Sequence, residues 1–82
     1  MIELAKIVET YEIDEENVKI LTKTTETYNV DTEAEVREMI EEGMNSHEFK
    51  LVAHTEKFKP AKYKKEELIH DEYYVVTLKK EF

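Results

Sequence analysis

Apolar and polar residues alternate with a helical period in one segment of the chain, residues 33–42. Val36, Met39 and Ile40 form a single apolar stripe there, as expected for a helix that covers a hydrophobic core. At 100° per residue the acidic positions fall on the opposite side, and they are Glu35, Glu38, Glu41 and Glu42. The pattern predicts one amphipathic helix with an acidic outer face.

The residues that flank this segment are typical of helix ends. Thr32 and Glu35 have capping-box spacing, in which the Thr hydroxyl accepts from the Glu35 amide and the Glu side chain reaches back. Glu33 and Glu35 lie in the first turn, where the helix dipole favours negative charge. Gly43 is the only glycine of the chain, and we expect it to end the helix in the left-handed conformation.

Alternating apolar residues predict three strands elsewhere. In residues 18–30 the positions expected to face a core are Val18, Ile20, Tyr28 and Val30. In the second strand they are Phe49, Leu51 and Ala53, and in the third Tyr74, Val76, Leu78 and Phe82. Tyr73 and Val75 then point away from the core, where they form a partner contact or lie beneath a loop.

Residues 2–13 fit two templates. Leu4, Ile7, Val8 and Tyr11 match helical spacing, whereas Ala5, Ile7, Tyr11 and Ile13 match a strand. We favour the strand, because residues 14–17, Asp-Glu-Glu-Asn, then make a hairpin turn into the next strand.

Together these elements predict an α+β fold in a single domain, residues 1–82. The predicted order is ββαββ, an antiparallel β-sheet with the one acidic helix packed on one face. Residues 57–71 then form a long lysine-rich connection, with a helical turn expected at residues 64–69. Eighty-two residues are too few for two hydrophobic cores.

Composition indicates an ordered protein without disulfides. The chain has no cysteine, which fits an intracellular protein and excludes thiolate metal sites. Eight aromatic residues weigh against disorder, although 39% of residues are charged. No apolar run approaches a membrane span, and the segment after Met1 lacks the layout of a signal peptide, so we expect Met1 to be a true start.

The net charge of −8 is distributed unevenly along the chain. Residues 1–47 hold thirteen acidic and four basic residues, whereas residues 48–82 hold seven acidic and eight basic residues. The segment Lys57–Lys65 contains five lysines and no acid. Two interpretations stay open: solvated faces that keep the protein soluble, or an acidic surface that binds a basic partner.

The acidic residues that would form such a surface are Asp14, Glu15, Glu16, Glu33, Glu35, Glu38, Glu41 and Glu42. Neighbouring carboxylates on a helix lie ~5–6 Å apart, a spacing comparable to that of phosphates along a nucleic-acid strand. With its small size, its pI of about 4.9 and this charge arrangement, the chain resembles the small acidic DNA-mimic inhibitors that phages use against host proteins.

This resemblance implies a non-enzymatic inhibitor that occupies the basic nucleic-acid-binding surface of a partner. The implied partners are a nucleoid protein of the HU type, RNA polymerase, or a repair or restriction enzyme. It also implies a cytoplasmic location in a bacterial host. The segment Lys57–Lys65 departs from the type, so it has to face away from the partner if the interpretation is right.

Candidate catalytic and metal-binding groups form no recognisable pattern. His47, His54 and His70 lack the spacing of paired metal ligands, and no nucleophile elbow surrounds Ser46. We therefore expect no catalytic residue, no metal and no cofactor. Phe58 and Tyr63 lie among lysines, as in surfaces that stack on single-stranded nucleic acid, but the net charge opposes a polyanion. We expect neither direct nucleic-acid binding nor membrane binding.

A second function stays open at this point. The chain also fits a phage structural or assembly protein that associates with itself through strand edges or through its oppositely charged poles. The sequence does not decide whether the protein forms a homodimer.

Overall fold

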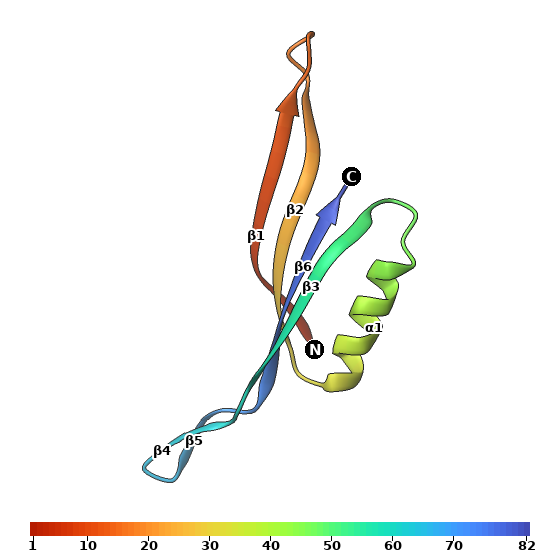
Figure 1. Ribbon diagram of the computed structural model, residues 1–82. Helices are drawn as coiled ribbons and strands as arrows, with labels where there is room; N and C mark the ends of the chain where they lie inside the picture. The colour runs from red at the N-terminus through yellow and green to blue at the C-terminus, as the bar shows by residue number, and fades with distance from the viewer.

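Strands β1 (Ile2–Ile13) and β2 (Lys19–Val30) form a long antiparallel hairpin in the computed structural model, which describes residues 1–82 (Figure 1). The turn between them is fixed by Asp14, whose Oδ1 accepts hydrogen bonds from the amides of Glu16 and Val18, both at 2.9 Å. Residues 2–13 are therefore a strand, as we favoured, and the hairpin turn lies where the sequence predicted it.

Helix α1 (Glu33–Met44) begins where the capping pattern predicted. Thr32 is the N-cap, and its Oγ1 accepts a hydrogen bond of 3.2 Å from the Glu35 amide. The prediction for Gly43 is wrong, because the helix continues through it and is capped by Asn45. Gly43 does not adopt a positive φ. It is buried instead against Leu51, whose Cδ2 would lie 3.2 Å from an added Cβ.

Strands β3 (Lys50–Lys59) and β6 (Tyr73–Glu81) complete a four-stranded antiparallel sheet in the order β1-β2-β6-β3. Two short strands, β4 (Lys62–Lys64) and β5 (Glu67–His70), form a separate hairpin at one end of the molecule (Figure 1). The α+β class is confirmed, but the order along the chain is ββαββββ and the predicted ββαββ is wrong.

The long connection predicted for residues 57–71 is also wrong. Strand β3 continues to Lys59, and no helical turn forms at residues 64–69. Lys65 and Glu66 have φ values of 52° and 66°, so both central residues of the β4–β5 turn are left-handed. Such a turn usually contains Asn or Gly, and the absence of both removed the sequence signal.

The core lies between α1 and one face of the sheet. Its buried apolar residues are Val30, Val36, Ile40, Val76 and Leu78, with Tyr28, Met39, Leu51 and Tyr74 packed around them. Val18 and Phe82, predicted to face a core, are about half exposed, because the strand ends extend beyond the helix. Ile20 is also exposed, because a register shift at Thr22 pairs it with Glu12 on the opposite face. Ala53 is also misassigned, since a bulge after Leu51 pairs it with Lys79 on the opposite face.

The molecule is elongated and has a large solvent-accessible surface for its mass. A compact 9.8 kDa protein exposes roughly 5,200 Å², whereas this chain exposes 6505 Å². Its radius of gyration is 16.3 Å, against roughly 12 Å for a compact domain of this length. No helix here has the length and apolar character that crossing a membrane requires.

Candidate interaction surfaces

The exposed side of α1 carries an acidic surface formed by four residues, which we call the acidic helix surface: Glu33, Glu38, Glu41 and Glu42. Glu33 pairs with Arg37 one turn away, at 2.8 Å. Glu38, Glu41 and Glu42 take part in none of the ion pairs of the structure. Three carboxylates on one helix face therefore have no cation of this chain beside them and are available to a partner.

Glu35 differs from these residues, although the sequence grouped it with them. Both of its carboxylate oxygens accept hydrogen bonds from the N-terminal ammonium of Met1, at 3.0 and 2.9 Å. The Thr32 hydroxyl also donates to Glu35, at 3.0 Å. These hydrogen bonds, that of the ammonium first, lower the pKa of Glu35. Glu35 thus fastens the N-terminus to the helix and is not a free acid.

The predicted acidic residues of the β1–β2 turn lie apart from the helix. Asp14, Glu15 and Glu16 occupy the tip of the long hairpin, at the end of the molecule opposite to β4 and β5 (Figure 1). The structure therefore divides the predicted site into two acidic regions, and the Asp14 carboxylate already holds the turn together. Sequence analysis missed this division, because the distance between the two acidic regions depends on the length of the β1–β2 hairpin.

The sheet face that α1 does not cover is basic. Strand residues alternate between faces, so Val75, Thr77 and Lys79 point away from the helix that covers Val76 and Leu78. The residues paired beside them share that face. The charged members of this basic open face are Lys6, Lys23, Lys50, Lys57, Lys59 and Lys79, with Glu3, Glu12 and Glu81.

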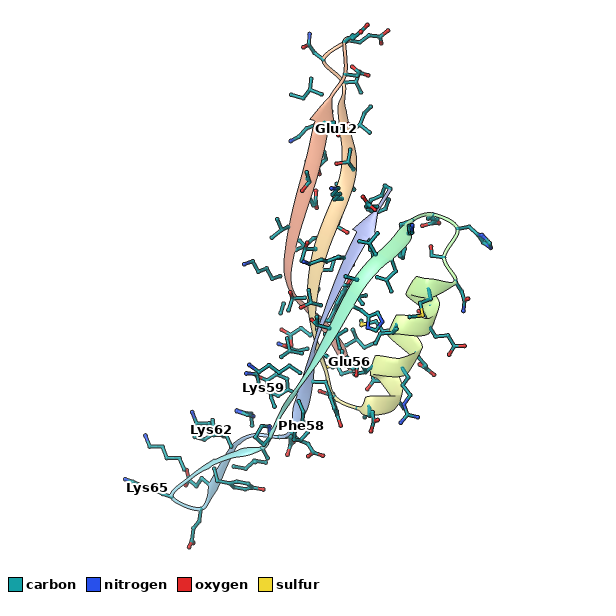
Figure 2. The ribbon with its side chains drawn as sticks, in the orientation of Figure 1. Glu12, Glu56, Phe58, Lys59, Lys62 and Lys65 are labelled. Atoms are coloured by element: carbon teal, nitrogen blue, oxygen red, sulfur yellow. The ribbon has the colours of Figure 1, made fainter.

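The lysine-rich segment accordingly lies away from the acidic helix surface. Lys59 belongs to the basic open face, and Lys62 and Lys65 lie on the β4–β5 hairpin (Figure 2). Phe58 points to the other side of the sheet, where its ring centroid lies 5.3 Å from that of Tyr74. The alternation of Lys57, Phe58 and Lys59 is the sequence signal that could have indicated that the lysines and the aromatic ring lie on opposite faces.

A buried ion pair joins β2 to β6 on the helix side of the sheet. Lys80 Nζ donates to Glu26 Oε1 at 2.9 Å, and the Thr24 hydroxyl donates to the other oxygen at 2.8 Å. The Tyr28 hydroxyl donates to Glu26 as well. Burial alone would raise the pKa of Glu26, but the hydrogen bonds from Tyr28, Lys80 and Thr24 outweigh it and lower the pKa. Sequence analysis missed this network, although Glu26 occupies a core-facing even position.

A cleft of about 340 Å³ opens beside this network, between the end of α1 and the sheet. Met39, Phe49 and Leu78 form its apolar walls, and Lys80 contributes a polar group. The ammonium of Lys80 is already held by Glu26 and lies 4.3 Å from the centroid of the Phe49 ring. The cleft is therefore a gap where α1 meets the sheet, and its ammonium group is already engaged within the protein.

No group of three or more His, Asp or Glu side chains is arranged to hold a metal ion. Comparison with protein-family models, with curated proteins and with solved structures finds no match. The geometry of the molecule itself shows charged surfaces of opposite sign on the two sides of the sheet.

Proposed function

We propose that this protein is a non-enzymatic inhibitor that mimics DNA. Its acidic helix surface occupies the basic nucleic-acid-binding surface of a partner protein in the cytoplasm of a bacterial host. One observation carries the proposal: the free carboxylates of α1 and the lysines of the basic open face lie on opposite sides of the sheet. A basic partner is therefore attracted to one side of the molecule and repelled from the other.

The spacing of the carboxylates supports mimicry of a phosphate backbone. Glu38 lies three residues before Glu41 and four before Glu42, so these side chains are neighbours at ~5–6 Å. At 1.5 Å per residue, Glu33 to Glu42 spans roughly 13 Å of helix axis, about the rise of four base pairs. The helix fixes the backbone that carries these carboxylates, so binding has to order only their side chains.

Competition with DNA tests this function. A labelled duplex is bound to an HU-type nucleoid protein, to RNA polymerase or to a restriction enzyme, and the chain is added to each complex. We expect release of the duplex from at least one of the three, and weaker release as salt increases, because ions at ~0.15 M screen exposed charges over ~8 Å. The proposal is wrong if none of the three complexes releases DNA at low salt.

Two matched variants identify the charged surface that competes with DNA. The first changes Glu33, Glu38, Glu41 and Glu42 to Gln, and leaves Glu35 intact because it holds the N-terminus. The second changes Lys57, Lys59, Lys62 and Lys65 to Gln. We expect the first variant to lose competition and the second to retain it. The reverse result would assign the activity to the lysines.

A further inference from the structure

The outer strand β1 carries a row of apolar side chains that nothing covers. Ile2 and Leu4 pair with Val30 and Tyr28 of the core face, so they lie on the helix side of the sheet. Alternation along β1 places further residues on the same side. We call this set the β1 apolar row, and its members are Ile2, Leu4, Ile7, Tyr11 and Ile13.

The helix is too narrow to cover this row. It packs against β3, β6 and β2, and β1 lies outside that contact (Figure 1). All five residues of the β1 apolar row are exposed, from Tyr11 at 39% to Ile13 at 70%. Glu9 interrupts the row between Ile7 and Tyr11, but five exposed apolar side chains beside a core of five buried residues are still characteristic of an interface.

The two edges of the sheet differ in their protection. Lysines on an edge strand discourage pairing with another strand, and β3 has three of them in ten residues, Lys50, Lys57 and Lys59. Strand β1 has a single lysine, Lys6, in twelve residues, together with Glu3, Glu9 and Glu12. Both edges contain a bulge, so the number of lysines and the exposure of apolar side chains make the difference. The sheet is therefore open to association at β1.

The exposed area agrees with an interface of ordinary size. The chain exposes 6505 Å², which exceeds the area of a compact protein of its mass by roughly 1,300 Å². A standard interface buries about 800 Å² on each partner. An interface of this standard size would bury more than half of the excess.

We propose that two copies of this chain pair antiparallel along their β1 edges. Identical strands that pair in this way are related by a two-fold axis perpendicular to the sheet, so one surface binds to its own copy. The two four-stranded sheets become one sheet of eight strands, and the two apolar rows lie side by side. Both helices then cover the same face, which presents two acidic helix surfaces to one side.

The mass of the protein in solution tests this pairing. Sedimentation equilibrium at protein concentrations up to about 200 μM is expected to give twice the 9.8 kDa of the single chain. Ile7→Lys places a charge in the interface and is expected to weaken association at least about tenfold. Val52→Lys is the matched control, since Val52 on β3 is exposed to 46% and Ile7 to 44%. It is expected to leave the dimer intact.

Cross-linking supplies a second readout that does not depend on Ile7. The chain contains no cysteine, so single cysteines introduced along β1 have no background. A two-fold antiparallel pair brings one position near the middle of β1 opposite its own copy, and oxidation there is expected to give a disulfide-linked dimer. Cysteines along β3 are expected to stay unlinked. A wild-type monomer at 200 μM, or cross-links confined to β3, would overturn the pairing.

Discussion

Lys80 Nζ lies 2.9 Å from Glu26 Oε1, and the two side chains are only 16% and 9% exposed. They extend the helix-side face of the sheet from Leu78, which is buried in the core, towards Phe49. A paired charge thus lies beside the buried apolar core, on the same face of the sheet. The Glu26–Lys80 pair matters for the stability of the fold, because the buried apolar core consists of only five residues.

Lys80→Met is expected to destabilise the fold by about 3 kcal/mol, because it leaves Glu26 buried without its cation. Lys23→Met is the control, since the Lys23–Glu81 pair on the same two strands is exposed and 3.9 Å long. That change is expected to cost less than about 0.5 kcal/mol. Urea unfolding of both variants measures the difference. Equal losses would show that burial of the Glu26–Lys80 pair is energetically unimportant.

Stability is expected to fall between about pH 10 and pH 12 because of Tyr28. Burial, followed by the hydrogen bond to Glu26, raises the pKa of Tyr28 from 10.0 to about 12. Between these values the unfolded chain loses the phenolic proton and the folded chain keeps it, so the native state loses stability as pH rises. The contribution of Tyr28 is fully present below pH 10.

Tyr28→Phe tests this assignment. The variant is expected to show a smaller decrease in the free energy of unfolding between pH 10 and pH 12 than the wild type, although it is less stable at neutral pH. Tyr63→Phe is the control, because Tyr63 is exposed on β4. Identical slopes for the wild type and Tyr28→Phe would contradict the raised pKa.

Gly43→Ala distinguishes a helical glycine from a left-handed helix end. In a helix, Ala is favoured over Gly by up to about 1 kcal/mol, but the new Cβ meets Leu51 at 3.2 Å. In a Leu51→Ala background that contact is absent, so Gly43→Ala is expected to stabilise the protein by about 0.5–1 kcal/mol. Thermal unfolding of the four chains of this double-mutant cycle gives the value. Destabilisation in both backgrounds would indicate a strained backbone.

Local signals predicted the parts of the fold that local chemistry determines. The Thr32 cap and the Asp14 turn each require only residues within four positions, and both formed as expected. The β4–β5 hairpin was missed because Lys65 and Glu66 are not turn-forming residue types. Long-range features were missed for another reason. The partner of Glu26 is Lys80, 54 residues away, and no local pattern indicates that pairing.

For the candidate site, too, sequence analysis missed the features that depend on long-range contacts. The sequence identified acidic residues on α1, and three of the predicted ones, Glu38, Glu41 and Glu42, are exposed and without an ion-pair partner. It did not show that Met1 neutralises Glu35, or that the hairpin tip lies far from the helix. Both facts depend on where β1 lies, which only the assembled sheet defines.

Capture from a bacterial lysate, followed by elution with duplex DNA, tests the central claim most directly. The immobilised chain is expected to retain basic DNA-binding proteins at low salt and to release them on addition of duplex DNA or about 0.5 M salt. The Gln variant at Glu33, Glu38, Glu41 and Glu42 is expected to retain none of them. If duplex DNA releases nothing, or if the Gln variant retains the same proteins, the acidic helix surface does not mimic DNA.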